Sequence, residues 1–377
     1  MLNLSQRSIR AHSSPIRKLA AYANQAKKAG KKVWHLNIGQ PDILAPEQAL
    51  RAVKEANLDL LPYSPSRGIP TYLEKLPRYY KKYDVSVNPD DILVTNGASE
   101  ALLFALLACL DANESVLTPE PFYANYLGFA GMAGVQVKPL PTTIETGFAL
   151  PSVEAFRLAI TPDVRAILLC NPNNPTGTAE PRAILREFIL SLPPDVTCIV
   201  DEAYLDFADD PAVGSVADLV GNSRRLVVLR TFSKLHGMAG VRCGYAITRP
   251  DIVNDIAGVR MSTPNIFAMR AARASLGDLE FLADTRRRIL ASRRRICGEL
   301  DALGLAYAKS QGNFVFFDTH MPIVEFEQIM LARNIRVGRP FPPFDTWCRI
   351  TVGRESEVDA FLAALRAVHA PALRKAV

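Results

Sequence analysis

The middle of the chain alternates short apolar segments with stretches of helical periodicity, and this alternation restricts the fold more than any other feature. Helical patterns, such as Ser99–Leu110 and Arg182–Leu190, separate the apolar segments. Parallel strands covered by helices on both faces are apolar nearly throughout. We therefore predict an α/β fold with a mostly parallel, seven-stranded central sheet flanked by helices. Its strands are predicted at Ile92–Thr95, Ser115–Thr118, Val135–Leu140, Ala166–Cys170, Thr197–Asp201, Leu226–Arg230 and Cys243–Thr248.

Both ends of the chain differ from the middle. Ser14–Ala29 predicts a helix with a proline near its first turn and Gly30 just after its end. After about residue 265 the pattern changes to long helices with few strands. A chain of 377 residues is long enough for two or three domains. We predict a large domain over residues 41–265, and a smaller α+β domain built from residues 1–40 and 266–377.

One predicted helix, Leu279–Leu303, carries two arginine triplets, at residues 286–288 and 293–295. The seven-residue spacing places both triplets on one face of the helix, opposite its apolar residues. A basic face can bind nucleic acid, but here no aromatic residues interleave with the arginines. We therefore favour a solvated face.

Composition excludes several classes of protein. Apolar residues make up 49% and charged residues 22%, and the net charge of +6 is mild, which leaves anionic small molecules as ligands but gives little support for nucleic acid. The six cysteines form no CxxC pair and the five histidines do not cluster, so no metal site is expected. The first residues lack the apolar core of a signal peptide, and the longest apolar stretch, Ala101–Leu110, is too short to cross a membrane. We expect a cytoplasmic protein.

A lysine that follows one predicted strand has the surroundings of a phosphate site. Lys234 stands next to Ser233 in a loop rich in serine and glycine, and Arg242 follows eight residues later. A hydroxyl, a guanidinium and backbone N–H groups together suit a phosphate dianion. A lysine beside a bound phosphate indicates covalent amine chemistry on a phosphorylated cofactor.

Other strands end in polar residues as well. Asp201 ends the strand Thr197–Asp201, where it could bind a metal or pair with the protonated nitrogen of a heterocycle; no nearby histidine or second acidic cluster supports the metal. Tyr204 lies three residues later and could bond a ring oxygen. The loop Asn171–Gly177 follows a third strand, and Thr95–Leu102 combines a strand end, a glycine turn and a helix start that can bind an anion.

At this point the chain resembles the fold-type I pyridoxal-phosphate (PLP) enzymes, specifically the class I and II aminotransferases. Eight motifs occur in the family's order along nearly the whole chain. They are Leu36–Asp42, Tyr63–Gly68, Asn96–Glu100, Pro121–Tyr123, Asn174–Gly177, Asp201–Tyr204, Ser233–Lys234 with Arg242, and Arg349–Gly353.

The resemblance implies a role for each matching residue. Lys234 links to PLP and then carries protons, Asp201 pairs with the ring nitrogen, and Tyr204 bonds the ring oxygen; these three are the implied catalytic residues. The resemblance also implies a homodimer with shared active sites, because Tyr63 would reach the phosphate in the neighbouring subunit. Further implied cofactor contacts come from Ala98, Ser99, Glu100, Tyr123, Asn174, Ser233 and Arg242, and substrate contacts from Gly39, Asn174 and Arg349.

The implied activity is transamination between an L-amino acid, or an amino-alcohol phosphate, and a 2-oxo acid, with ping-pong kinetics. Some motifs resemble the histidinol-phosphate aminotransferase branch, whereas Leu36–Asp42 resembles the aspartate branch, so the substrate stays open. Arg339 could bind a second anionic group or lie on the surface. A PLP-dependent lyase or decarboxylase is the alternative enzyme, and a PLP-binding regulator the alternative outside catalysis.

Overall fold

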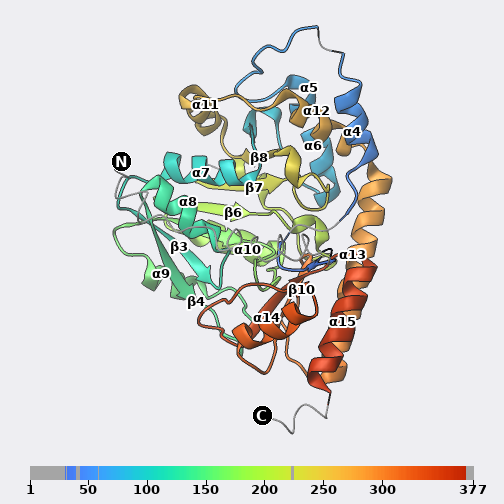
Figure 1. Cartoon of the computed structure of the whole chain (residues 1–377). Helices are drawn as coiled ribbons and strands as arrows, with labels where there is room; N and C mark the ends of the chain where they lie inside the picture. Colours follow the sequence, from blue (N-terminus) through green and yellow to red (C-terminus); the bar gives the residue numbers. More distant parts are fainter. Residues whose placement is uncertain (1–29, 31, 40–42, 58, 222–224, 371–377) are drawn as a thin grey trace, which may run out of the picture.

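The computed structural model describes residues 30, 32–39, 43–57, 59–221 and 225–370. Its centre is a seven-stranded sheet, counted over these residues, with the strand order β2-β8-β7-β6-β5-β3-β4 (Figure 1). β8 runs in the opposite direction to the other six strands, which are parallel to one another. The fold class, the number of strands and their mostly parallel arrangement are confirmed. The strands are β2 (Ile92–Thr95), β3 (Ser115–Glu120), β4 (Gln136–Pro141), β5 (Val164–Cys170), β6 (Thr197–Asp201), β7 (Leu226–Thr231) and β8 (Gly244–Ile247).

Helices cover both faces of this sheet, as its apolar strands require. Alternate residues of a strand point to opposite faces, so Ile199 of β6 packs in one core and Val200 in the other. One face lies under α7 (Ala98–Cys109) and α8 (Asn125–Ala133). The other face lies under α4 (Glu47–Lys54), α5 (Pro70–Leu73), α6 (Leu76–Tyr80), α9 (Val153–Ala159), α10 (Arg182–Ser191) and α12 (Ile266–Ser275), and α11 (Pro250–Val259) packs beside β2.

The two ends of the described chain meet in a second core. The strand β1 (Trp34–His35) pairs in parallel with β10 (Ile335–Arg336), and Leu36 packs among C-terminal apolar residues. The other elements there are α13 (Leu279–Leu303), β9 (Phe314–Asp318), α14 (Ile323–Ala332), β11 (Trp347–Thr351) and α15 (Glu355–His369), with β9 and β11 antiparallel (Figure 1). The predicted helix Ser14–Ala29 lies outside the described residues.

The division into domains stays a prediction, and the packing of α12 bears on its boundary. Ala268, Met269 and Ala272 of α12 belong to the core beneath the large sheet, although they follow residue 265. This packing favours a boundary near Gly277, just before α13.

The arginines of α13 correct one expectation. Arg293 is buried, where it pairs with Asp209 at 2.5 Å and donates to the carbonyl of Gly312 at 2.9 Å. One heptad earlier, Arg286 donates to the carbonyl of Asp206 at 3.1 Å. Each triplet therefore turns its first arginine inward. The other two arginines of each triplet are exposed: Arg287 and Arg288 in the first, Arg294 and Arg295 in the second. The predicted face is solvated only in part, because the inward arginines bind backbone carbonyls and a carboxylate of other segments.

Candidate active site

The carboxyl ends of the parallel strands meet at one edge of the sheet, and a cavity of about 260 Å³ opens there. Ligands of open α/β sheets bind in this position. Nine residues predicted from the sequence line the cavity: Ala98, Ser99, Tyr123, Asn174, Asp201, Tyr204, Ser233, Lys234 and Arg242. The fold thus brings together residues that are up to 144 positions apart, from 98 to 242.

Lys234 reaches the cavity from the loop after β7. Its Nζ donates to the carbonyl oxygen of Gly39 at 3.1 Å, so the segment after β1 closes over the amine. Burial, helped by the nearby positive charge of Arg349, lowers the pKa of Lys234 to about 8. A lowered pKa increases the fraction of neutral amine, the form that attacks a carbonyl carbon.

Asp201 occupies the last position of β6 and is buried. Tyr126 donates its hydroxyl to Asp201 Oδ2 at 2.9 Å, and the backbone N–H of Ala203 donates to Oδ1 at 3.1 Å. Burial raises the pKa of Asp201, and these hydrogen bonds and Lys234 oppose the rise. The sequence analysis missed Tyr126. It lies in the first turn of α8, three residues after Tyr123, and both tyrosines line the cavity.

An anion cradle surrounds the start of α7. Ala98 and Ser99 are its first residues, so their backbone N–H groups have no partners within the helix. Arg242 donates to Ser233 Oγ at 3.3 Å and to the carbonyl oxygen of Asn96 at 3.2 Å. Gly97 has a φ of 85°, and a Cβ there would lie 2.4 Å from Arg242 Nη2. A side chain at Gly97 would therefore displace the guanidinium.

A second cation lies on the other side of the cavity. Arg349 of β11 is buried and donates to Asn174 Oδ1 and to the carbonyl oxygen of Asn37, each at 2.8 Å. Asn174 in turn donates to the hydroxyl of Tyr204 at 3.1 Å. This chain of bonds joins the predicted carboxylate-binding arginine to the predicted ring contacts. Asn313, which the sequence analysis missed, donates to the carbonyl of Gly39 at 3.3 Å.

Four predicted residues are not among those that line the cavity. Gly39 and Arg349 adjoin it through their hydrogen bonds with Lys234 and Asn174, whereas Glu100 and Tyr63 lie elsewhere. Glu100 pairs with the buried guanidinium of Arg260 at 2.7 Å and accepts from the backbone N–H of Asn96 at 2.8 Å. Its position does not support a contact with the cofactor, because its carboxylate is bonded to Arg260 and to the turn before α7 and does not line the cavity. Tyr63 is 94% exposed on the outside of the chain.

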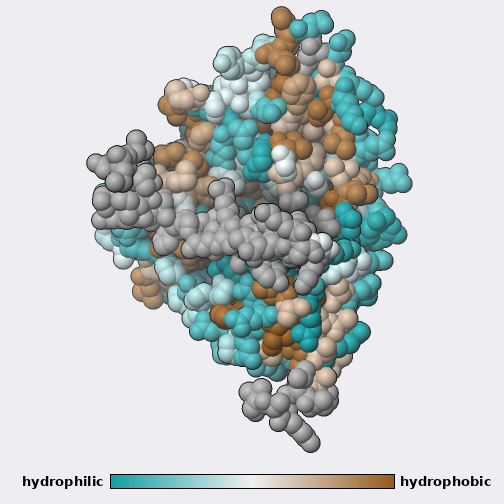
Figure 2. All heavy atoms as spheres, viewed as in Figure 1, coloured by the Kyte–Doolittle hydropathy of each residue, from teal (hydrophilic) through white to brown (hydrophobic). Residues whose placement is uncertain are grey.

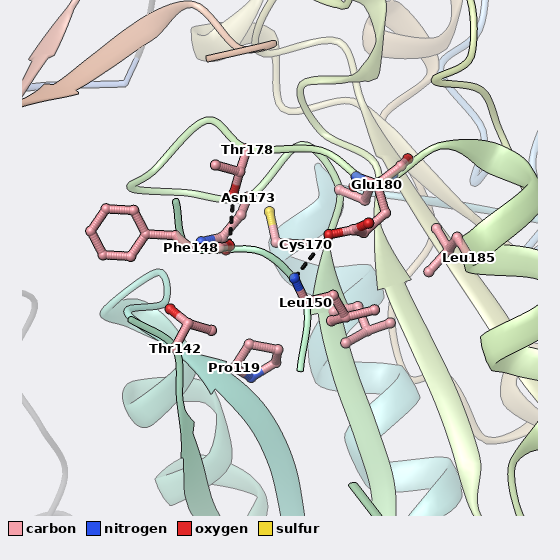
Figure 3. A pocket seen from close by; sticks show the side chains of 11 residues that line it. Pro119, Thr142, Phe148, Leu150, Cys170, Asn173, Thr178, Glu180 and Leu185 are labelled. Atoms are coloured by element: carbon pink, nitrogen blue, oxygen red, sulfur yellow. Dashed lines mark hydrogen bonds between the residues drawn. The ribbon is translucent and has the colours of Figure 1, made fainter. Parts of the chain in front are cut away.

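A smaller cavity of about 40 Å³ adjoins the site behind the loop that carries Asn173 (Figure 3). Cys170 lines both cavities. The small cavity has room for one or two water molecules and none for a ring with a phosphate. Glu180 closes one side, where it accepts from the backbone N–H of Leu150 at 2.8 Å.

The residues of the large cavity fit PLP. The cradle of Ser233, Arg242 and the start of α7 offers donors to a phosphate, and no carboxylate of the described residues lines that side. The buried Asp201 can accept from a ring N–H, and Tyr204 and Asn174 can donate to a ring oxygen. The amine of Lys234 faces the same space.

Comparisons with known proteins agree with this geometry. The family model "Aminotransferase class I and II" matches residues 31–365. A histidinol-phosphate aminotransferase of Rubrobacter xylanophilus is 35% identical, over 73% of this chain and 76% of the relative. One of Moorella thermoacetica is 30% identical, over 75% of this chain and 73% of the relative. The structure of Thermus thermophilus aspartate aminotransferase with maleate superposes with a TM-score of 0.88 at 26% identity, over 98% of this chain and 100% of that one. The chain therefore belongs to the class I and II aminotransferases, and it is an enzyme that uses pyridoxal phosphate to move an amino group between an amino acid and a 2-oxo acid.

Proposed function

We propose that Lys234, Asp201 and Tyr204 carry the chemistry of this transamination. The observation that supports the proposal is their position in one cavity, with the anion cradle on one side and Arg349 on the other. Bound PLP supplies a carbonyl carbon for the amine and a ring that accepts electrons. Lys234 Nζ would hold the cofactor and, as a free amine, would remove the proton from the substrate α-carbon.

Asp201 keeps its negative charge in this scheme. Its carboxylate would accept a hydrogen bond from the protonated ring nitrogen of a bound cofactor, which would strengthen the ring as an electron acceptor. Tyr126 and the backbone N–H of Ala203 hold the carboxylate in place. Tyr123 would cover the ring, and Ala98, Ser99, Ser233 and Arg242 would bind the phosphate.

Arg349 binds the substrate carboxylate. A guanidinium presents two parallel N–H groups that match both oxygens of a carboxylate. Arg349 now bonds an amide oxygen and a backbone carbonyl, neutral acceptors that an anionic substrate can replace. Asn174 and Gly39 line the same side of the site and complete the substrate contacts.

Arg339 favours a substrate that carries a second anionic group. Arg339, Arg349 and Tyr123 line one small cavity, and Arg339 stacks on Phe341 at 4.1 Å. Burial, together with the charge of Arg349, lowers the pKa of Arg339 to about 10. Two neighbouring guanidiniums with no carboxylate lining that cavity among the described residues create a site for anions.

This pair of cations makes histidinol-phosphate aminotransferase activity the second candidate. An amino-alcohol phosphate has no α-carboxylate, so its phosphate would be the group that Arg339 or Arg349 binds. A panel of amino donors that includes acidic, aromatic and neutral amino acids and histidinol phosphate distinguishes the candidates. A marked preference for neutral aliphatic donors would contradict a second anion subsite.

Transamination and a lyase reaction differ in what a single donor does. With an amino donor alone, a transaminase converts its cofactor to the amino form and stops, and a 2-oxo acid then restores it. A decarboxylase or lyase would turn over the donor without an acceptor. Absorbance during addition of donor and then acceptor therefore tests the proposed reaction.

A homodimer with shared active sites is part of the proposal. The loop between α4 and α5 exposes Leu60, Leu61 and Tyr63 at 78%, 65% and 94%, and apolar side chains project there at the top of Figure 2. Ser64 ties this loop to the carbonyl oxygen of Pro264 at 2.5 Å, close to the exposed Met261. Exposed apolar groups gathered in this way mark interaction surfaces.

No described helix is long and apolar enough to cross a membrane. We propose a cytoplasmic location.

A further inference from the structure

A buried arginine lies behind the active site, on the other face of the sheet. Arg230, near the end of β7, is only 3% exposed. Leu229 pairs with Asp201 in the sheet, so Arg230 points to the face opposite Asp201. Its guanidinium donates to the carbonyl oxygen of Glu202 at 3.2 Å and to the carboxylate of Asp206 at 3.0 Å.

These two bonds hold both ends of one turn. Residues 202–206 directly follow Asp201 and contain Tyr204, which bonds Asn174 at 3.1 Å. Arg230 itself lies four residues before Lys234 on the neighbouring strand. One guanidinium thus connects the segment that carries Lys234 to the segment that carries Asp201 and Tyr204.

We propose that Arg230 is a positioning residue that fixes Asp201 and Tyr204 relative to Lys234. The inference rests on the proposed roles of those three residues. Arg230 does not line the cavity, so it acts through the turn and through its charge. Burial raises the pKa of Asp201, and the charge of Arg230 is among the influences that oppose the rise. When the cofactor occupies the amine of Lys234, Arg230 still supplies a positive charge behind the carboxylate.

The surroundings of Arg230 keep the clamp rigid. The carboxylate of Asp206 also accepts from Lys82 at 2.8 Å and from Tyr83 at 2.5 Å, and Tyr79 bonds it as well. Burial alone would raise the pKa of Asp206, but Arg230 and Lys82 hold it well below its usual range. A second carboxylate, on Glu202, lies 3.6 Å from Arg230. Separating Arg230 from Asp206 would leave a buried charge without its partner, which is costly.

Lysine cannot replace this arginine fully. The planar guanidinium donates in two directions at once, toward Glu202 and toward Asp206, whereas an ammonium is a compact charge on a flexible stem. Arg230→Lys keeps the charge and loses the fork. Arg230→Met loses both and roughly keeps the volume.

Arg293 offers a matched control. It is also buried, and it also makes one bond to a carboxylate, Asp209, and one to a backbone carbonyl, Gly312. Its bonds join α13 to loops outside residues 201–206. Arg293→Met therefore removes the same kinds of bonds without releasing the turn.

The experiment compares the wild type with Arg230→Lys, Arg230→Met and Arg293→Met. Three quantities are measured: the thermal midpoint, the Kd of PLP for the apoprotein from quenching of protein fluorescence, and the pH midpoint of the near-visible absorbance of the holoenzyme. Both methionine variants should lose thermal stability. Only Arg230→Met should raise the Kd of PLP, by roughly tenfold or more, and shift the absorbance midpoint, and Arg230→Lys should lie between it and the wild type.

Each outcome decides the question. If Arg230→Lys and Arg230→Met keep the wild-type Kd and absorbance midpoint, Arg230 only stabilises the fold and the inference is overturned. Equal shifts in Arg293→Met would overturn it too, because general loosening would then explain them. If Arg230→Met does not fold, Arg230→Lys decides alone by the same criteria. A wild-type protein that does not bind PLP would instead contradict the proposed function.

Discussion

At the scale of single residues, the proposed site uses two basic side chains for different tasks: Lys234 for the cofactor and Arg349 for the substrate carboxylate. Burial lowers the pKa of Lys234 to about 8, so its amine can become neutral, whereas Arg349 stays a permanent cation on a rigid strand. Asn174 connects the two parts of the site, because it accepts a hydrogen bond from Arg349 and donates one to Tyr204.

The pKa of Lys234 gives a prediction for cofactor capture. A group with a folded pKa of about 8 is mostly protonated at pH 7 and mostly neutral at pH 9. The rate at which apoprotein captures PLP should therefore rise about tenfold from pH 7 to pH 9 and level off above. Stopped-flow absorbance measures this rate. A rate that keeps rising steeply past pH 10 would show that the lysine has its ordinary pKa.

Borohydride reduction should fix the cofactor on Lys234 and on no other lysine.

Arg349→Lys separates substrate binding from cofactor binding. The lysine cannot form the two parallel bonds to a carboxylate. We expect a loss of about 2–4 kcal/mol in kcat/KM for a carboxylate donor, the range for one truncated partner of a buried charge pair. The near-visible absorbance of the holoenzyme should stay unchanged. Single-turnover reaction with a good donor measures the effect, and a rate within threefold of the wild type would remove Arg349 from the site.

At the scale of elements, the start of α7 and the start of β8 form one unit. Gly97 precedes the helix in a conformation that side chains rarely adopt, and Arg242 precedes the strand, also with a positive φ of 60°. Thr95 of β2 pairs with Gly244 of β8, which brings the two turns together. The pairing of β2 with β8 therefore brings Arg242 to the start of α7, and the pairing of Thr231 of β7 with Gly244 brings Ser233 beside them.

Gly97→Ala tests this unit. The added Cβ would clash with Arg242 Nη2, so Arg242 must move out of the cradle. The alanine would also keep a positive φ, which is strained for any residue with a Cβ. We expect the Kd of PLP to rise by about tenfold or more, and stability to fall by about 1–3 kcal/mol. Titration of the apoprotein with PLP measures the first, and denaturant unfolding the second. Gly131→Ala in α8, where a Cβ meets nothing within 4 Å, is the control.

Local pattern was enough to predict the seven strands and the cavity, because buried parallel strands are apolar and their carboxyl ends meet at one edge. Pattern could not predict where partners come from. The ion pair of Glu100 with Arg260 and that of Arg293 with Asp209 join segments 160 and 84 residues apart. Tyr126 was missed because the motif ended at Tyr123, before the start of α8, whose first turn carries Tyr126 into the cavity.

At the scale of the whole molecule, we propose that the exposed loop that carries Tyr63 forms part of the contact between two subunits. We expect a dimer in sedimentation. Because Tyr63 is predicted to complete the neighbouring site, mixing Lys234→Ala subunits with Tyr63→Ala subunits should restore part of the activity lost by each, since one site of the hybrid is intact. An active monomer, or mixtures no more active than their parents, would contradict shared sites. Leu61→Asp, at a position 65% exposed in the same loop, should weaken the dimer, whereas Leu158→Asp, at a position 78% exposed on α9, should not.

The pairing of β1 with β10 has a consequence for how the chain matures during translation. His35 must wait for its partner Arg336, which the ribosome adds 301 residues later. At bacterial or eukaryotic elongation rates this delay is roughly 15–60 s. All strands of the large sheet are synthesised by residue 247, before Arg336, while the segment that closes over Lys234 still lacks its partner strand. The pocket is therefore completed last, and a nascent chain released before residue 336 would have the lysine but not its cover.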